Sequence, residues 1–299
     1  MSASVSVIRA PENHRHGIYW MLLTMFLFVS MDTVAKYLTA SYPVHQVVWA
    51  RYIFHVLLLF AWLGPRAPWV LRTRRLGLQL WRSLLLLLTT FFFFTALSFM
   101  ALVDASVIMF IGPIVLTLLA ALVLREHVGA RRWSGVVIGF IGALIVIRPG
   151  TSMLQPAAVF AVAAACCYAL YQITTRQLSY SDAPLTTLSY TALVGALLSS
   201  FAAPFGWVWP DAAGWALMAL VGLIGGLGHF CVIKAFQAAP AAVVAPFGYS
   251  SIVWSTSFGF VIFEHLPDIW TIFGGTIIIG SGIYILHRER VRSRNAQSR

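Results

Sequence analysis

Charged residues inside long apolar stretches are the first candidates for chemistry in this sequence. Asp32, Lys36 and Arg51 lie in such stretches, where an isolated charge costs at least about 2.5 to 3.5 kcal/mol at the centre of a bilayer. At a helical rise of about 1.5 Å per residue, Asp32 would lie about 9 Å and Arg51 about 10 Å from the hairpin that joins their two segments. Charges at such depths need a partner or a water-filled cavity.

Two interpretations of Asp32 remain open. Asp32 either binds a substrate ammonium or carries a proton, or it neutralises Arg51 in a structural ion pair. Lys36 is a second possible partner, because it lies one helical turn from Asp32 on the same face. Equal depth on adjacent helices slightly favours the ion pair with Arg51.

Other polar residues within apolar segments have a binding and a structural interpretation. Lys36 and Arg176 occupy matching positions in the two halves of the chain, where they can act as gates, although snorkelling to lipid headgroups is the simpler prediction. Lys234 can bind a substrate carboxylate or snorkel to the headgroups. A single histidine such as His229 is more often a packing residue. Gln172 occupies the position in the second half that matches Asp32.

Two apolar segments carry a proline near their middle, Pro113 after Gly112 and Pro246 before Gly248. A proline inside a helix leaves a carbonyl without its hydrogen bond, and paired interruptions in corresponding segments indicate a transporter binding site. Aromatic residues near these breaks could line a cavity for an apolar or aromatic side chain. The candidates are Phe94, Phe110, Tyr168, Tyr249 and Trp254.

The composition indicates that the whole chain is embedded in a membrane. Of 299 residues, 60% are hydrophobic and 10% are charged, and the mean hydropathy is +0.85. The apolar runs have about the length needed to cross a bilayer as helices. We expect an all-α integral membrane protein with ten transmembrane helices, at residues 17–38, 44–64, 77–99, 104–123, 131–148, 156–178, 184–206, 213–236, 241–262 and 270–287.

The positively charged residues are concentrated in the loops between the apolar segments and in the tails. Most of the positive residues behind the net charge of +11 lie just beyond apolar segments, as in the run from Arg72 to Arg75 and in the C-terminal tail. This distribution predicts cytoplasmic loops, with both termini in the cytoplasm of a bacterial-type inner membrane, and it argues against nucleic-acid binding. The three cysteines lie inside apolar runs and form neither a metal nor a disulfide pattern.

The two halves of the sequence resemble each other. Phe94-Thr95-Ala96 is matched by Phe230-Cys231-Val232 at an offset of 136, and the segment from Met31 to Leu38 by the segment from Tyr171 to Leu178 at an offset of 140. This predicts two repeats, residues 1–150 and 151–299. Because each holds five helices, an odd number, the second repeat would be inverted relative to the first, an arrangement typical of secondary transporters.

The segments from Asp104 to Ile114, Leu124 to His127 and Ala239 to Phe247 resemble the EamA-type repeat of the drug/metabolite transporter superfamily. The resemblance covers nearly the whole chain, twice. Among the members, ten-helix bacterial exporters of amino acids, including aromatic ones, look most similar in layout. The resemblance implies a central cavity lined by helices 1, 3, 4, 6, 8 and 9. The small multidrug branch uses an acidic residue in its first helix, but Gln172 replaces a second acid here.

The function predicted from these observations is secondary transport of amino acids or related small metabolites across the inner membrane, as export, by a monomer or weak oligomer. An exporter of cationic drugs is the alternative within this class, because it would use Asp32 and the aromatic residues. An intramembrane enzyme would need a catalytic cluster that the sequence lacks. We expect no metal, cofactor or nucleotide site.

Overall fold

The computed structural model describes residues 14–64, 67–112, 114–115, 118, 130–147, 157–178, 181–239 and 241–297, and these form helices and connecting segments without a strand. The helices in chain order are α1 (His14–Thr39), α2 (Val44–Leu63), α3 (Ala67–Val70), α4 (Leu76–Phe99), α5 (Leu102–Met109), α7 (Ala130–Ile147), α8 (Ala157–Leu178), α9 (Pro184–Ala202), α10 (Ala212–Ala238), α11 (Ala241–Val244), the 3-10 helix η2 (Ala245–Tyr249), α12 (Ser250–Phe263) and α13 (Ile269–Gln297).

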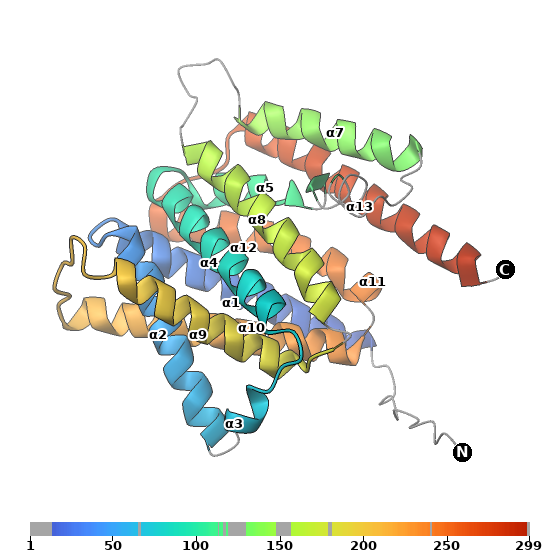
Figure 1. Cartoon of the computed structure of the whole chain (residues 1–299). Helices are drawn as coiled ribbons and strands as arrows, with labels where there is room; N and C mark the ends of the chain where they lie inside the picture. The colour runs from blue at the N-terminus through green and yellow to red at the C-terminus, as the bar shows by residue number, and fades with distance from the viewer. Residues whose placement is uncertain are drawn as a thin grey trace, which may run out of the picture.

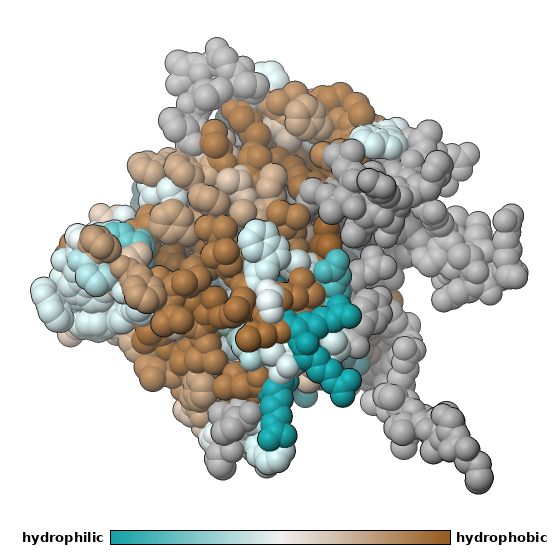
Figure 2. Space-filling model, viewed as in Figure 1, coloured by the Kyte–Doolittle hydropathy of each residue, from teal (hydrophilic) through white to brown (hydrophobic). Residues whose placement is uncertain are grey.

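Six of the described helices, α1, α2, α4, α8, α9 and α10, are long and apolar enough to cross a membrane, and α7 and α13 contain shorter apolar stretches. Helices suit this environment because they satisfy their backbone hydrogen bonds internally. Large apolar side chains such as Phe140, Val261 and Phe273 are exposed on the surface. Figure 2 shows hydrophobic residues across the middle of the visible face, as expected for a surface that contacts lipid.

Helices from the two halves of the chain pack against each other in pairs. Helix α1 packs along α10, α4 along α8, and α7 along α13, while α2 contacts both α9 and α10. Figure 1 shows α7 and α13 side by side at one edge of the bundle. The buried core is therefore shared between the halves.

The turns after α1 and after α8 have the same hydrogen bonds. In the first turn, the amides of Ser41 and Tyr42 both donate to the carbonyl of Leu38, at 3.0 and 2.8 Å. In the second turn, the two amides 140 positions later both donate to the carbonyl of Leu178, at 2.9 Å. The offset of 140 positions between the two halves of the sequence therefore recurs in the backbone hydrogen bonds of these turns.

The helix boundaries agree with the predicted segments within a few residues, apart from four differences. Helix α13 continues to Gln297, ten residues beyond the segment predicted over 270–287. The segment predicted over 104–123 contains α5, which ends at Met109, and most of its remainder lies outside the described residues. The segment predicted over 241–262 is divided into α11, η2 and α12, with Pro246 inside the 3-10 turn, because proline cannot complete the α-helical ladder. Helix α9 ends at Ala202, earlier than predicted.

Candidate functional site

Arg51, on α2, lies at the centre of a buried polar cluster between α1, α4 and α10. Its side chain is 4% exposed. Its Nε donates to the sulfur of Met31 at 3.4 Å, its Nη1 donates to Oγ1 of Thr90 at 3.0 Å, and its Nη2 lies 3.4 Å from Nε2 of His229. All three partners are uncharged or weakly basic groups, so they satisfy hydrogen bonds without neutralising the guanidinium.

Aromatic and imidazole rings surround this guanidinium. The guanidinium carbon of Arg51 lies 4.7 Å from the centroid of the Tyr52 ring, and the Tyr52 hydroxyl lies 3.2 Å from Oγ1 of Thr90. The imidazoles of His55 and His229 are stacked, with centroids 5.9 Å apart and planes inclined by 7°. His229 is therefore part of the Arg51 cluster, whereas the sequence favoured a packing role.

Arg82, on α4, forms a second centre that the sequence analysis missed. This side chain is 6% exposed. It donates to the hydroxyls of Thr175 at 2.7 Å, Tyr171 at 2.6 Å and Thr191 at 2.5 Å, and it lies 4.3 Å from the centroid of the Tyr171 ring. Tyr168 stacks on Tyr171 with centroids 5.6 Å apart. Arg51 on α2 and Arg82 on α4 are thus two buried guanidinium groups that are bonded mainly to hydroxyls of neighbouring helices.

Asp32 is half-buried on α1, and the direct ion pair predicted with Arg51 is absent. The structure records no oxygen of Asp32 within 4.0 Å of a basic nitrogen, and no hydrogen bond to its carboxylate, among the residues described. Arg51 attracts this carboxylate at longer range. The pair does not close because the guanidinium is turned toward Thr90 and His229.

The Lys36 side chain extends toward the C-terminal end of α4, where it has protein partners. Its Nζ donates to the carbonyls of Leu97 at 2.8 Å and Met100 at 2.7 Å, at the end of α4. The same ammonium lies 5.4 Å from the centroid of the Phe263 ring. The side chain of Arg176, the matching residue, lies outside the described part of the chain.

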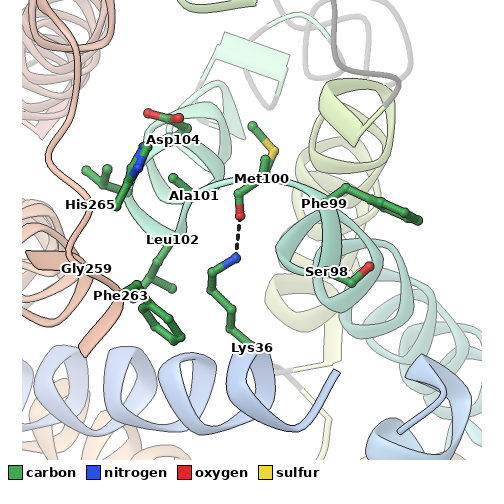
Figure 3. Close-up of a pocket in the computed structure, with 11 residues that line it drawn as sticks. Lys36, Ser98, Phe99, Met100, Ala101, Leu102, Asp104, Gly259, Phe263 and His265 are labelled. Atoms are coloured by element: carbon green, nitrogen blue, oxygen red, sulfur yellow. Dashed lines mark hydrogen bonds between the residues drawn. The ribbon is translucent and has the colours of Figure 1, made fainter. Parts of the chain in front are cut away.

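A cavity of about 350 Å³ lies beside Lys36, lined by the ends of α1, α4 and α12 and the start of α5. Figure 3 shows Lys36 reaching from α1 toward the carbonyl of Met100, with Phe263 to one side and His265 next to Asp104. A second cavity, of about 230 Å³, shares Met100, Asp104 and His265 with the first. The first cavity lies between α1, α4, α5 and α12, and the second lies between α5, α7, α8 and α13.

Aromatic rings lie near the two helix breaks. A Cβ at Gly112 would lie 4.0 Å from the Tyr168 ring, whereas one at Gly248 would meet nothing within 4 Å. Phe110 and Tyr249, which flank the two breaks, have ring centroids 4.8 Å apart. The breaks therefore face rings that the sequence predicted to line a cavity, while Pro113 lies outside the described residues.

The remaining predicted site residues are more dispersed. Phe94 is 1% exposed in the core, and Gln172 is half-buried on α8. Trp254 packs against Phe26 with centroids 5.1 Å apart. The ammonium of Lys234 lies 5.5 Å from the centroid of the Phe230 ring. No group of three or more potential metal ligands occurs in the described residues.

The sequence profile of the EamA-like transporter family matches the chain twice, over residues 15–148 and 155–287. An S-adenosylmethionine uptake transporter of Rickettsia prowazekii is 28% identical over 281 residues, covering 94% of this chain and 96% of that protein. A riboflavin transporter of Vibrio cholerae is 27% identical, covering 94% of this chain and 96% of that protein. A pseudopaline exporter of Pseudomonas aeruginosa is 26% identical, covering 89% of this chain and 94% of that protein.

A solved crystal structure shares the fold, with a TM-score of 0.63 and 18% identity, and the match covers 90% of this chain and 95% of that chain. The family profile, which covers most of the sequence, agrees with the lipid-compatible surface and with the polar interior. The chain is a multi-pass membrane transporter of small metabolites, not an enzyme, and it belongs to the EamA-like transporter family of the drug/metabolite transporter superfamily.

Proposed function

We propose that this transporter carries a metabolite that combines an α-amino-acid group with an aromatic ring, by alternating access of the Arg51 and Asp32 region to the two sides of the membrane. The transport is secondary, driven by a gradient. S-adenosylmethionine, whose molecule has both groups, is the first candidate to test, because relatives with that named substrate match nearly the whole chain.

The observation that carries this proposal is that the opposite charges of Arg51 and Asp32 form no direct ion pair among the described residues. The buried guanidinium of Arg51 contacts a thioether, a hydroxyl and an imidazole, and the carboxylate of Asp32 has no hydrogen bond among the described residues. A carboxylate of the substrate can pair with Arg51 and its ammonium with Asp32. Charge-assisted hydrogen bonds of this kind are about twice as strong as neutral ones.

Stacked rings support an aromatic group on the substrate. The pairs Tyr168–Tyr171 and His55–His229 present flat surfaces near the two arginines, and the Tyr168 ring faces Gly112 at one helix break. Binding sites of small molecules combine such apolar surfaces with a few placed polar groups. Both S-adenosylmethionine and riboflavin, named as substrates of relatives, contain a flat heterocycle.

We propose further that the chain has ten transmembrane helices in two inverted halves, residues 1–150 and 151–299. The two matches of one family profile support this division, as do the equivalent turns after α1 and α8. The pairing is reciprocal too: the first helix of each half packs on the third long helix of the other, α1 on α10 and α8 on α4. An inner membrane with both termini in the cytoplasm agrees with the charge distribution.

A second candidate is the exporter of organic cations, because Asp32 with nearby aromatic rings also suits a cation without a carboxylate. The direction of transport is part of the same question. The sequence analysis predicts export, and relatives include named uptake transporters and a named exporter. Arg51 distinguishes an organic cation from a substrate with a carboxylate, since a buried guanidinium repels the cation but attracts the carboxylate.

Counterflow in proteoliposomes tests the proposal. We expect uptake of labelled S-adenosylmethionine or an aromatic amino acid, competition by α-amino acids with a free carboxylate, and none by their decarboxylated amines. Asp32→Asn and Arg51→Gln should each lower transport at least about tenfold, the loss of about 1.4 kcal/mol of binding. Glu264→Gln, at an exposed position, is the matched control. Transport of cationic dyes that survives Arg51→Gln would favour the second candidate.

A further inference from the structure

The C-terminal end of α4 forms an acceptor site for a cation. The last carbonyls of a helix lack intrahelical partners and carry partial negative charge. Two of them, on Leu97 and Met100, accept hydrogen bonds of 2.8 and 2.7 Å from the Lys36 ammonium. The ring of Phe263 faces the same ammonium at 5.4 Å, and Asp104 attracts it electrostatically. Two carbonyl oxygens and a ring face therefore surround the ammonium as they would an organic cation, while the Asp104 carboxylate, which is bonded to Thr271, acts on it from a greater distance.

We propose that this acceptor site is a binding site for the cationic group of the substrate at the entrance of the transport pathway, and that Lys36 occupies it as a tethered ligand until the substrate displaces it. This inference rests on the proposed function. The site would receive a primary ammonium, or a sulfonium such as that of S-adenosylmethionine. Displacement of Lys36 would release α1 from the end of α4.

The position of Lys36 supports exchange with a ligand. The residue is half-buried and borders a cavity of about 350 Å³, so an incoming cation can reach the two carbonyls without unfolding a helix. Figure 3 shows the Lys36 side chain extended across the space between α1 and α4, with Phe263 at its side. An ammonium has three donors, and the two carbonyls use two of them.

Lys234 shows that a lysine near an aromatic ring does not by itself make such a site. Its Nζ lies 5.5 Å from the centroid of the Phe230 ring, nearly the same distance as for Lys36 and Phe263. The structure records no hydrogen bond from Lys234 to a carbonyl among the described residues. The carbonyls at the end of α4 therefore distinguish the Lys36 site, and Lys234 provides a matched control.

Chemical rescue tests the proposal without a transport assay. Lys36→Ala leaves the site empty, and n-propylammonium has the length of the removed part of the side chain. We expect n-propylammonium to raise the apparent melting temperature of the purified variant in a saturable way, by about 2 to 4 °C. The wild-type protein and Lys234→Ala should not respond, and propanol, which is neutral, should not act on any of them. Lys36→Met, which fills the site, should respond less than Lys36→Ala.

Each outcome decides the question. Rescue of Lys36→Ala by n-propylammonium, including recovery of a folded variant only when the amine is present, supports the cation site even if the proteoliposomes transport no amino acid. In that case the proposed function fails and the site stands. A folded Lys36→Ala without an amine response, or a variant that stays unfolded with and without the amine, overturns the inference. Equal responses of Lys36→Ala and Lys234→Ala also overturn it.

Discussion

The carboxylate of Asp32 and the guanidinium of Arg51 face a shared polar interior from adjacent helices without forming an ion pair. The guanidinium is bonded to Thr90 on α4 and lies against His229 on α10, and its Nε donates to the sulfur of Met31 on α1, so Arg51 ties α2 to three other helices. Arg51 still attracts Asp32. Neither charge is neutralised by direct contact with the other, so each is available to the opposite charge of a zwitterionic ligand.

The first prediction follows from that separation. Asp32→Asn breaks no hydrogen bond recorded among the described residues, so we expect its melting temperature to stay near that of the wild type while transport falls. Arg51→Gln should cost about 1 to 3 kcal/mol of stability, because it removes donors from buried partners. In the double variant the loss should be somewhat smaller than the sum of the two single losses, because Arg51 attracts Asp32 at longer range. Thermal unfolding and counterflow on both singles and the double measure this, and a double variant more stable than Arg51→Gln would indicate an ion pair.

A second prediction concerns the contact between α10 and α2 that positions Arg51. A Cβ at Gly222 would lie 3.0 Å from the His55 amide and 3.1 Å from the Arg51 carbonyl, and would also meet Phe54. Gly222→Ala should therefore push α10 from α2, lower stability by about 1 to 3 kcal/mol, and reduce transport. Gly280→Ala, on α13 with nothing within 4 Å, is the control and should gain up to about 1 kcal/mol. Equal melting temperatures for both variants would contradict the expected crowding.

The sequence predicted the long helices because their apolar runs match the thickness of a bilayer. It also singled out Asp32, since charged residues within apolar segments are rare enough to be conspicuous. Tyr168 was chosen as an aromatic residue near a helix break, and for His229 a packing role was favoured. Arg82 was missed because positive charge was assigned mainly to the loops, although Arg82 lies inside the segment predicted over 77–99.

Contacts between distant segments could not be predicted from the sequence. Lys36 meets carbonyls more than sixty positions away, and the rotation of α1 against α4 decides between this contact and the headgroups. The orientation of Arg51 likewise depends on Thr90 and His229, which lie on two other helices. A break was expected at Pro246, but the sequence did not show that it would take the form of a 3-10 helix from Ala245 to Tyr249.

A third prediction concerns Asp182, in the turn between α8 and α9. Partial burial tends to raise the pKa of this carboxyl, but hydrogen bonds from Thr73 and Gln79 outweigh it and hold the pKa below the ordinary value of 3.8. A lowered pKa means that the ionised form stabilises the fold, fully above pH 3.8 and progressively less as the pH falls through the lowered pKa. Asp182→Asn should thus be less stable than the wild type at neutral pH, and the difference should shrink in acid.

Thermal unfolding of both proteins over a pH series checks this dependence. Thr73→Val removes one of the donors and should reduce the same pH-dependent difference. A gap between the wild type and Asp182→Asn that stays constant down to about pH 3 would mean that the charge of Asp182 contributes nothing.

A fourth prediction concerns orientation in the membrane. Tyr42, after α1, contacts Asp211 at the start of α10, whereas Asp182 contacts Thr73 ahead of α4, so these turns mark two ends of the bundle. On a background without Cys166, Cys167 and Cys231, a cysteine at Trp209, which is 81% exposed, should react with an impermeant maleimide in intact cells. A cysteine at Arg74 should react only after lysis. The reverse pattern would invert the predicted topology.

The last prediction concerns the helix breaks. A Cβ at Gly248 would meet no atom within 4 Å, and a Cβ at Gly112 would lie 4.0 Å from the Tyr168 ring. Both positions can therefore accommodate larger side chains. Gly112→Leu would then extend toward the stacked tyrosines near Arg82, and Gly248→Leu would extend into the open space beside η2. We expect both variants to be expressed and monodisperse, with melting temperatures within a few degrees of the wild type, because neither disturbs a tight helix contact.

Transport should fall in both variants if the breaks line the pathway, since a leucine side chain would occupy volume that the substrate needs. Gly112→Ala and Gly248→Ala serve as graded controls and should retain more transport than the leucine variants, because a single methyl group fills little of that space. Counterflow at several substrate concentrations, with substrates of different size, tests whether these positions line the pathway. A substitution at a lining position should weaken the apparent affinity more for a larger substrate than for a smaller one. Full transport by both leucine variants, with normal folding, would remove Gly112 and Gly248 from the binding site and leave Arg51 and Asp32 to define it.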